Sequence, residues 1–153
     1  MVELPRNPDL PALLRPGIAL VTSTPSDSHT WNLVFLQLVL EEAGFAVRNL
    51  GACTPIPLVL DACRGLRPDL LVVSSVNGHG HTEGAELIAS VRRESDVPAV
   101  IGGMLTTGRM DQEKVVASLT RLGYEAVFTG DSALPDFGLF LDSPAVRGVA
   151  DAR

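Results

Sequence analysis

Continuous apolar runs and amphipathic stretches alternate along most of the chain. Residues 17–23 and 69–75 each contain an unbroken apolar run, which is the pattern of a strand buried on both faces of a sheet. The first run is followed by apolar residues at helical spacing, namely Trp31, Val34, Phe35, Leu38 and Val39. This spacing predicts a helix of about 13 residues that ends before Gly44, with Trp31 as a core residue or a staple at its start.

The same alternation continues to residue 141. Short strands are expected at residues 45–50, 97–101 and 125–129, and helices at residues 56–64, 83–93, 111–122 and 133–141. Residues 1–16 contain Pro5, Pro8, Pro11 and Pro16, and proline removes backbone N–H donors, so an extended arm is expected there. Residues 142–153 are expected to form a loose C-terminal tail, which leaves residues 17–141 as the folded domain.

Strands that alternate with helices predict a doubly wound α/β fold. We expect a five-stranded parallel sheet, flavodoxin-like or Rossmann-like, with right-handed crossovers and the strand order 2-1-3-4-5. In that order the connections reverse between the first and third strands, and ligands bind at the carboxyl ends of the strands beside this switch point. The loops expected there are residues 24–30, 76–82 and 102–108, which are rich in Gly, Ser, Thr and His.

Composition narrows the classes of function. With 153 residues, of which 46% are hydrophobic and 20% charged, the chain is long enough for one domain with a substantial core. The net charge of −6 disfavours nucleic acid and anionic lipid as partners, because Lys and Arg carry such binding. No apolar stretch approaches the ~20 residues of a membrane helix, so we expect no membrane partner and a cytoplasmic location. Cys53 and Cys63 are expected to be reduced packing thiols.

Two clusters contain residues that could bind a metal. Asp27 and His29 are two positions apart, so in an extended loop the carboxylate can reach one imidazole nitrogen and leave the other free for a metal. Most Asp-x-His pairs are ordinary loop residues, and the pattern alone leaves both interpretations open. His79, His81 and Glu83 could form a second cluster, or the exposed Gly-His-Gly-His loop could be a surface for a cofactor or partner.

Two other ligand classes fit parts of the pattern. The hydroxyls around the first loop suit a flavodoxin-like phosphate site at a helix N-terminus, but residues 76–82 contain no aromatic ring to stack on a flavin. A receiver domain would have an aspartate at the end of the third strand, where this chain has Ser74 and Ser75. The hydroxyl residues concerned are Thr22, Ser23, Thr24, Ser26 and Ser28.

Taken together, three loops match a known pattern. The chain resembles the cobalamin-binding domains that carry D-x-H-x-x-G, then S-x-L, then G-G, here Asp27-Ser-His29-Thr-Trp-Asn32, Ser74-Ser-Val76 and Gly102-Gly103. Within these domains it is most similar to the small subunits of glutamate mutase (methylaspartate mutase), and the resemblance covers roughly residues 17–135. The stretches that carry this similarity are Ser26-Asp-Ser-His, Glu42-Ala-Gly-Phe, Ser74-Ser-Val-Asn-Gly-His-Gly and Gly123-Tyr.

The resemblance assigns roles to individual residues. It implies that His29 replaces the corrinoid's own base as the lower axial ligand of cobalt, with Asp27 behind it, and that Ser74 hydrogen-bonds the buried base. Gly102 and Gly103 are expected to let the backbone approach a flat ring, because a Cβ would collide with it. The implied cofactor-binding residues are Ser26, Asp27, Ser28, His29, Thr30, Ser74, Ser75, Val76, Gly102, Gly103, Met104, Leu105, Thr106, Thr107 and Gly108, and the metal ligand is His29.

The sequence departs from the family pattern at two motif positions. Asn32 stands where the family has glycine, and Val76 stands where it has leucine. A valine still provides an apolar wall. Asn32 could hydrogen-bond the nucleotide tail of the corrinoid or narrow its channel, and the pattern does not decide between these effects.

The resemblance also implies an activity. It indicates the cobalamin-binding subunit of an adenosylcobalamin-dependent carbon-skeleton mutase, an isomerase that interconverts L-glutamate and 3-methylaspartate. Radical isomerisation needs a closed substrate cavity, so we expect no catalytic residues in this chain and a larger substrate-binding mutase subunit as partner. One alternative is a corrinoid carrier for methyl transfer. Such carriers usually have a helical cap domain ahead of the binding domain, and residues 1–16 are too few to form one. The other alternative is a cobalamin sensor. Arg109 is the cation expected near a substrate carboxylate.

Overall fold

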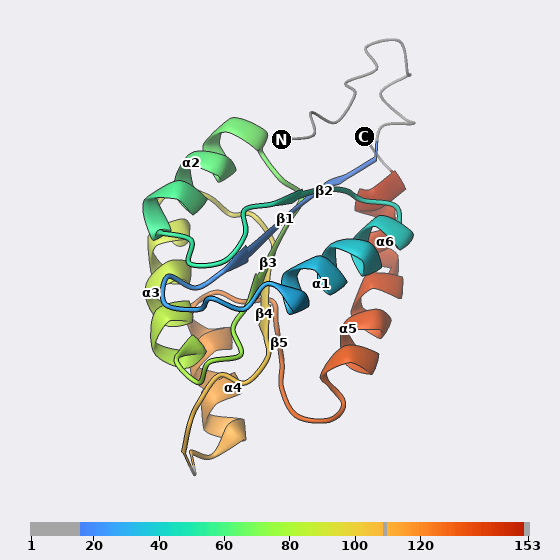
Figure 1. The fold of residues 1–153 in the computed structure, drawn as a ribbon. Helices are drawn as coiled ribbons and strands as arrows, with labels where there is room; N and C mark the ends of the chain where they lie inside the picture. Colours follow the sequence, from blue (N-terminus) through green and yellow to red (C-terminus); the bar gives the residue numbers. More distant parts are fainter. Residues whose placement is uncertain (1–15, 109, 152–153) are drawn as a thin grey trace.

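The computed structural model describes residues 16–108 and 110–151 and confirms the predicted doubly wound fold (Figure 1). Its parallel five-stranded sheet has the order β2-β1-β3-β4-β5, as predicted. The strands are β1 (Ile18–Ser23), β2 (Ala46–Asn49), β3 (Leu70–Ser74), β4 (Ala99–Gly102) and β5 (Ala126–Phe128). The helices are α1 (Trp31–Glu42), α2 (Ile56–Leu66), α3 (Gly80–Arg92), α4 (Gln112–Leu122), α5 (Ala133–Asp142) and α6 (Pro144–Asp151).

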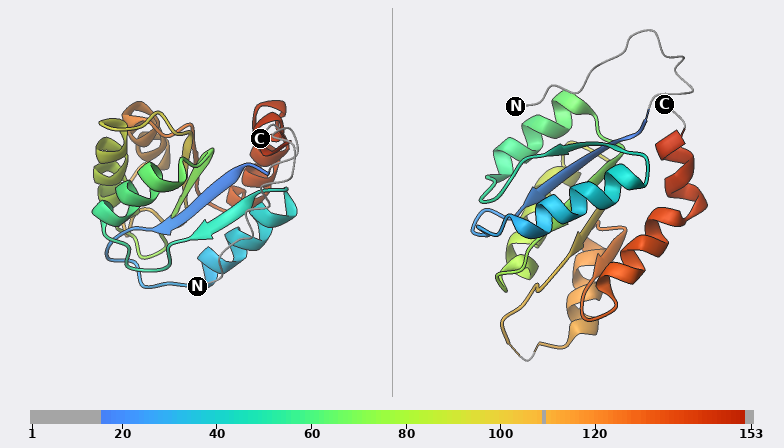
Figure 2. Two further views of the ribbon diagram at one scale, coloured as in Figure 1. Left: turned by 90° about the horizontal axis from the view of Figure 1, so that it is seen from above. Right: turned by 45° about the vertical axis from the view of Figure 1, so that its right-hand side comes forward.

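Side chains of the central strands are buried alternately on the two faces of the sheet. Leu20 and Leu71 belong to one core cluster with residues of α2, α3 and α4. Val21 and Val72 belong to a second cluster with residues of α1 and α5. The views in Figures 1 and 2 show the same two layers, with α2, α3 and α4 on one side of the sheet and α1, α5 and α6 on the other. Because both faces are covered, the strands appear in the sequence as continuous apolar runs.

The predicted apolar face of α1 is wrong except at Val39, which packs against the core. The core contains Leu33 and Leu40, whereas Trp31 is 87% exposed and Leu38 is 59% exposed. Nearly every residue from 31 to 40 is apolar, so helical spacing is satisfied by two different faces and cannot identify the buried one. Trp31 is therefore neither a core residue nor a staple. We call the exposed residues Trp31, Val34, Phe35 and Leu38 the α1 stripe.

Two further boundaries differ from the sequence prediction. Helix α3 begins at Gly80, three residues before the predicted start at residue 83. Gly80 packs closely against Ser75 and Leu105, and a Cβ at this position would clash with both. The expected loose tail after residue 141 contains a helix, α6, and Val146 of this helix packs against the core cluster of α1 and α5. The expected N-terminal arm and Arg109 lie outside the described residues, apart from Pro16.

None of the helices in the described part of the chain combines the length and the apolar character that a span of a lipid bilayer requires.

Candidate functional site

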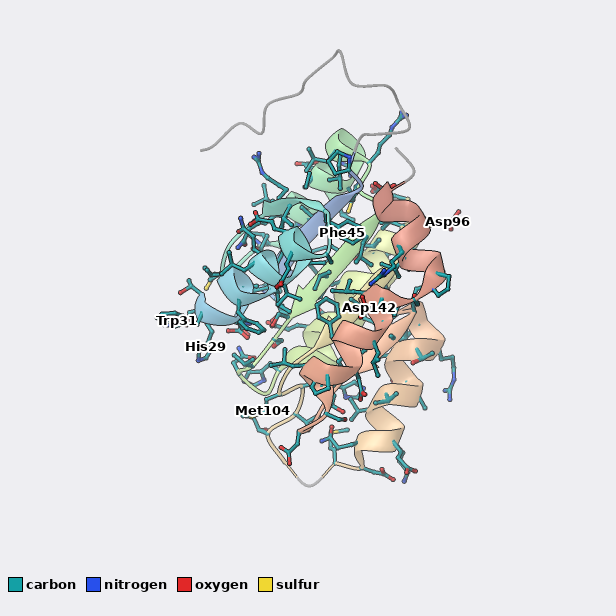
Figure 3. All side chains as sticks on the ribbon, turned by 90° about the vertical axis from the view of Figure 1, so that its right-hand side faces the viewer. His29, Trp31, Phe45, Asp96, Met104 and Asp142 are labelled. Carbon is teal, nitrogen blue, oxygen red and sulfur yellow. The ribbon has the colours of Figure 1, made fainter. Side chains whose placement is uncertain are left out.

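Three loops lie together at the carboxyl end of the sheet. Ser23, Ser74 and Gly102 are partners in the strand register, so the loops after β1, β3 and β4 begin at the same level. Figure 3 shows His29 and Trp31 side by side at this end, with Met104 on the same side of the molecule. Hydrogen bonds join the second and third of these loops, because Gly78 N donates to Met104 O and His81 N donates to Leu105 O. The structure therefore assembles the loops that the sequence singled out.

Asp27 anchors the first loop to the second. Its side chain is fully buried, and its Oδ2 accepts a hydrogen bond from Val76 N at 2.6 Å. Its Oδ1 accepts from His29 N at 2.9 Å and lies 2.7 Å from His29 Nδ1. Burial acts to raise the pKa of this carboxyl, but the hydrogen bonds from His29 and Val76 outweigh it and lower the pKa below its ordinary value of 3.8. Asp27 is therefore a buried carboxylate that holds its charge.

His29 is oriented by Asp27 and projects outward. An ionised Asp27 accepts a hydrogen bond from the N–H of Nδ1, which leaves Nε2 with its lone pair. The imidazole is 56% exposed, and Figure 3 shows it at the surface beside Trp31. A carboxylate behind a histidine in this way fixes the tautomer that binds metals and raises its basicity. This geometry leaves Nε2 of His29 available to a ligand.

A metal at His29 would need its other ligands from a cofactor. Within residues 16–108 and 110–151, no group of three or more His, Cys, Asp or Glu side chains is placed to hold a metal ion. The alternative cluster of His79, His81 and Glu83 does not form, because His81 Nε2 pairs with Ser118 Oγ at 3.3 Å and Glu83 accepts from Ser26. A single histidine suits a metal whose remaining coordination positions are filled by a prosthetic group.

An apolar cavity of about 410 Å³ opens beside this histidine loop. It lies between α1 and α5, over the carboxyl halves of β3, β4 and β5. Phe128 and Phe137 form part of its wall and pack edge to face with ring centroids 5.4 Å apart. The other apolar lining residues are Trp31, Phe35, Leu36, Val72, Val73, Val76, Val100, Ile101, Ala133 and Leu134. A cavity of this size and character can hold a planar organic ring together with part of a tail.

Two polar side chains interrupt the apolar lining. Asn32 Nδ2 donates a hydrogen bond of 2.6 Å to Ser74 Oγ, which ties the first turn of α1 to the end of β3. Asn32 Oδ1 is also buried. Among the buried side-chain polar atoms that the structure describes, it is the one without a hydrogen-bond partner. A buried acceptor without a partner costs free energy unless a ligand or water supplies a donor. This atom has almost no accessible surface although the cavity is open, so it lies behind the apolar lining and not in the cavity itself.

Gly102 and Gly103 line the cavity, but the chain itself requires them. A Cβ on Gly103 would collide with Ser75 O, and Gly103 has a φ of +121°, which side chains other than that of glycine rarely adopt. A Cβ on Gly102 would lie 2.9 Å from Phe128 O. The expectation that these glycines make room for a ligand ring is therefore not needed to explain them. They allow β3, β4 and β5 to pack closely at the base of the cavity.

Other predicted residues support the loops without lining the cavity. Ser26 Oγ donates to Glu83 at 2.9 Å and accepts from Asn77 Nδ2 at 3.0 Å, which joins the first loop to the second. Ser75 is buried and its Oγ accepts from Thr24 Oγ1 at 3.3 Å. These bonds hold the loop of His29 in one position relative to β3.

The remaining predicted residues differ in their exposure. Met104 is 60% exposed on the side of His29, and Ser28, Thr30, Thr107 and Gly108 are also exposed. Leu105 is 2% exposed and packs in the core with α3 and α4, on the other face of the sheet from the cavity. Thr106 Oγ1 accepts a weak bond from Gln112. Leu105 therefore supports the third loop from behind and cannot reach a ligand in the cavity.

Sequence reasoning missed much of the cavity wall. Phe35 and Leu36 of α1, Phe128 of β5, and Leu134 and Phe137 of α5 all line it. These side chains are apolar and carry no chemical signal that separates a cavity wall from an ordinary core residue. The topology could have placed α5 beside α1, but only coordinates show that the two helices leave a gap.

A second hollow of about 500 Å³ lies between α2 and α3 and is a weaker candidate. It is bordered by exposed charges, including the ion pair of Arg64 and Glu94 at 2.8 Å. It also lies away from the carboxyl ends of the strands, since its lining includes Pro68 before β3 and Val97 before β4. The site described here is therefore the cavity with Asp27 and His29.

Comparisons with known proteins identify a family and several relatives. The profile of a family described as B12 binding domain matches residues 17–136. The glutamate mutase sigma subunit of Halobacterium salinarum is 35% identical over 115 residues, which cover 72% of this chain and 77% of that relative. The HTH-type transcriptional repressor CarA of Myxococcus xanthus is 31% identical over 102 residues, which cover 66% of this chain and 34% of that repressor.

Solved structures show the same fold. The crystal structure of the methanol:cobalamin methyltransferase complex MtaBC from Methanosarcina barkeri contains a chain that superposes with a TM-score of 0.65 at 20% sequence identity. The match covers 89% of this chain and 48% of that one, so this chain spans about half the length of the protein it matches. At this level of identity the likeness concerns the fold alone.

Proposed function

Since the chain belongs to the B12-binding domain family and is similar to glutamate mutase sigma subunits, we propose that it is the cobalamin-binding subunit of an adenosylcobalamin-dependent carbon-skeleton mutase. Its proposed substrate is L-glutamate, which the complete enzyme would convert to 3-methylaspartate. The domain boundaries at residues 17 and 141 are part of this proposal, with α6 as an added packing element.

One observation carries the proposal. Asp27 holds His29 with Nε2 free at the surface, and the apolar cavity opens next to it in the same set of loops. A corrinoid whose own base is displaced from the cobalt would fit both features, because it offers a metal to His29 and a flat aromatic base to the cavity. His29 would bind the cobalt, and the cavity would take the base beside Asn32 and Ser74.

The residues of the site then each have a physical role. Asp27 keeps the imidazole of His29 in one tautomer and one orientation, and the hydrogen bond to Val76 fixes Asp27 itself. The walls contributed by α1 and α5 exclude water from the base, and Ser74 supplies a hydroxyl at the end of β3. When bound, adenosylcobalamin supplies homolysis of its cobalt–carbon bond, and the protein supplies binding and orientation.

A second subunit is part of the proposal because the face with His29 is open. His29, Trp31 and Met104 are all more than half exposed at this end of the molecule. Radical chemistry needs a cavity that shields the substrate from water. A larger substrate-binding subunit that covers this face would close it. The expected role of Arg109 towards a substrate carboxylate stays a prediction, because this residue lies outside the described ones.

The function is tested by reconstitution. The chain is mixed with the large subunit of a glutamate mutase and with adenosylcobalamin, and the interconversion of glutamate and 3-methylaspartate is assayed. We expect turnover by the mixture and none by either subunit alone. Turnover that required methylcobalamin and a methyl acceptor would replace this proposal by a corrinoid carrier, and turnover by the isolated chain would contradict the need for a partner.

The α1 stripe is expected to contact the large subunit. It begins at Trp31, two residues from His29, and continues along α1 to Leu38, which is 59% exposed. An exposed apolar surface that continues from a proposed interface is a usual docking surface. The substitution Leu38→Glu should weaken binding of the large subunit by about tenfold or more, because it places a charge in an apolar contact.

The control for this prediction is Leu122→Glu on α4, which adds the same charge at an exposed leucine in the other helix layer. It should leave binding of the large subunit unchanged, as measured by surface plasmon resonance with cobalamin present. If both substitutions weakened binding of the large subunit equally, or if neither weakened it, the large subunit would bind elsewhere on the surface.

A further inference from the structure

Asn77 links the loop after β3 to the loop of His29 through both ends of its side-chain amide. Its Oδ1 accepts hydrogen bonds from His79 N at 3.0 Å and from Ser75 Oγ at 3.2 Å. Its Nδ2 donates to Ser26 Oγ at 3.0 Å. Because a backbone N–H can only donate, the bond from His79 fixes which end of the amide is the oxygen, and Nδ2 must face Ser26.

The same side chain holds the turn of residues 24–27 at two points. Asp27 N donates to Thr24 O at 3.1 Å and closes this turn. The turn is held at Thr24, whose Oγ1 donates to Ser75 Oγ at 3.3 Å, and Ser75 Oγ donates to Asn77. The turn is also held directly at the residue before Asp27, by the bond from Asn77 Nδ2. The carboxylate that orients the imidazole is therefore fixed through Asn77.

The hydroxyl of Ser26 needs an amide beside it and not a carboxylate. Ser26 Oγ has one proton, which it donates to Glu83 Oε2 at 2.9 Å, so its other neighbour must be a donor. Asn77 Nδ2 is that donor. The substitution Asn77→Asp would keep the shape of the side chain, but it would remove the donor and place a second carboxylate against the same hydroxyl. Ser26 is exposed and the other two side chains are half-buried, so the net contribution of these bonds to the stability of the fold is small.

We propose that Asn77 is a positioning residue for His29, and that its amide sets how tightly this histidine binds a metal. The inference rests on the proposed binding of cobalt by His29. A loop that leaves the binding position must be ordered again when the metal binds, and this cost lowers the affinity. Asn77 acts through Ser26 and the turn that contains Asp27, without contact with the metal. It is not one of the residues that the resemblance assigned to the cofactor.

The first measurement uses the full chain without a ligand. Histidine nitrogens are labelled, and NMR correlations between ring protons and nitrogens show which nitrogen carries the proton at a pH where the rings are neutral. In the natural chain His29 should carry the proton on Nδ1, as its bond to Asp27 requires. In Asn77→Asp the signals of both tautomers should appear, because the imidazole then leaves the carboxylate for part of the time. The variant His29→Gly identifies which signals belong to His29.

The second measurement is an absorbance titration of the full chain with aquacobinamide, a corrinoid without a nucleotide tail, and then with cobalamin. Binding of aquacobinamide depends on His29 and not on the cavity. Asn77→Asp should lower both affinities about tenfold. Adding Glu83→Gln should restore most of the loss, because the new amide can donate to Ser26, whose proton is then free for the new carboxylate. The matched control is His79→Asp, which adds the same charge at an exposed position of the same loop and should leave both affinities unchanged.

The outcomes separate this inference from the proposed function. If Asn77→Asp keeps a single tautomer and the natural affinities, or if Glu83→Gln does not restore what is lost, Asn77 is not a positioning residue, while the binding of cobalamin stands. If the natural chain binds neither corrinoid, the proposed function fails, and the NMR measurement still decides whether Asn77 orients His29. Circular dichroism shows whether each variant is folded. Asn77→Ala, which removes the donor without adding a charge, decides the question if Asn77→Asp is not.

Discussion

Replacing His29 by glycine is expected to remove the spectrum of imidazole-bound cobalt while leaving the fold intact. The imidazole is 56% exposed, and Asp27 keeps its bonds from the backbone of residues 29 and 76 when the ring is absent. The free energy of unfolding should therefore change by no more than about 1 kcal/mol. The affinity for cobalamin should fall by at least about tenfold, because the cobalt loses its protein ligand.

Two measurements check this expectation. Absorbance titration with cobalamin should show base-off, imidazole-bound corrin for the natural chain and not for His29→Gly, and added imidazole should restore the spectrum. The matched control is His79→Ala, because His79 is an exposed histidine on the loop after β3. This control should behave like the natural chain. An unchanged spectrum for His29→Gly would count against His29 as the ligand.

Removing the carboxylate of Asp27 is expected to affect both stability and binding. The substitution Asp27→Ala removes a fully buried carboxylate and leaves the N–H groups of Val76 and His29 without their acceptor. We expect a loss of about 2–4 kcal/mol in the free energy of unfolding in urea. We also expect cobalamin affinity to fall about 10- to 100-fold, as for other groups that orient a metal-binding histidine.

Asp96→Ala is the matched control, because Asp96 is exposed and lies away from the site in Figure 3. It should change the unfolding free energy by less than about 0.5 kcal/mol and leave binding unchanged. If Asp27→Ala were as stable as this control, Asp27 would not anchor the two loops.

The contribution of Asp27 to the free energy of unfolding should also decrease at low pH. Its pKa in the folded chain lies below the ordinary value of 3.8, so the unfolded chain takes up the proton first as the pH falls. The difference in unfolding free energy between the natural chain and Asp27→Ala should be constant above about pH 5 and shrink as the pH falls through 3.8 to the lower folded value. Urea unfolding at a series of pH values measures this difference, and a difference that grows towards low pH would contradict the assignment.

The sheet and the loops at its carboxyl end could be predicted because buried parallel strands have a simple sequence pattern. Residues 18–21 of β1 and 70–73 of β3 are all apolar, and the polar residues after them fall on the same edge. The pair of Asp27 and His29 was predictable for the same reason, since a short spacing in a loop restricts where the side chains can lie. The structure bears out their contact, while the binding of cobalt stays a proposal.

The faces of the helices could not be predicted in the same way. Helix α1 is apolar on nearly all sides, so Leu33 and Trp31 satisfy the same periodicity although one is buried and the other is 87% exposed. The cavity was not predictable because its wall depends on the distance between α1 and α5. Asn32 is an instructive case, since the sequence marked it as a departure from the family pattern and only the coordinates show its bond to Ser74 and its orphaned Oδ1.

The most direct test of the central claim is electron paramagnetic resonance of the chain with cobalamin in its cobalt(II) form. A nitrogen bound axially to cobalt(II) splits each cobalt line, as a triplet for the natural spin-one isotope and as a doublet for the spin-half isotope. The protein is prepared with every histidine nitrogen replaced by the spin-half isotope, and the cobalamin is left unlabelled. If Nε2 of His29 is the lower ligand, the lines become doublets, and His29→Gly loses them. Lines that remain triplets would show that the cobalamin keeps its own base, and this result would contradict the account.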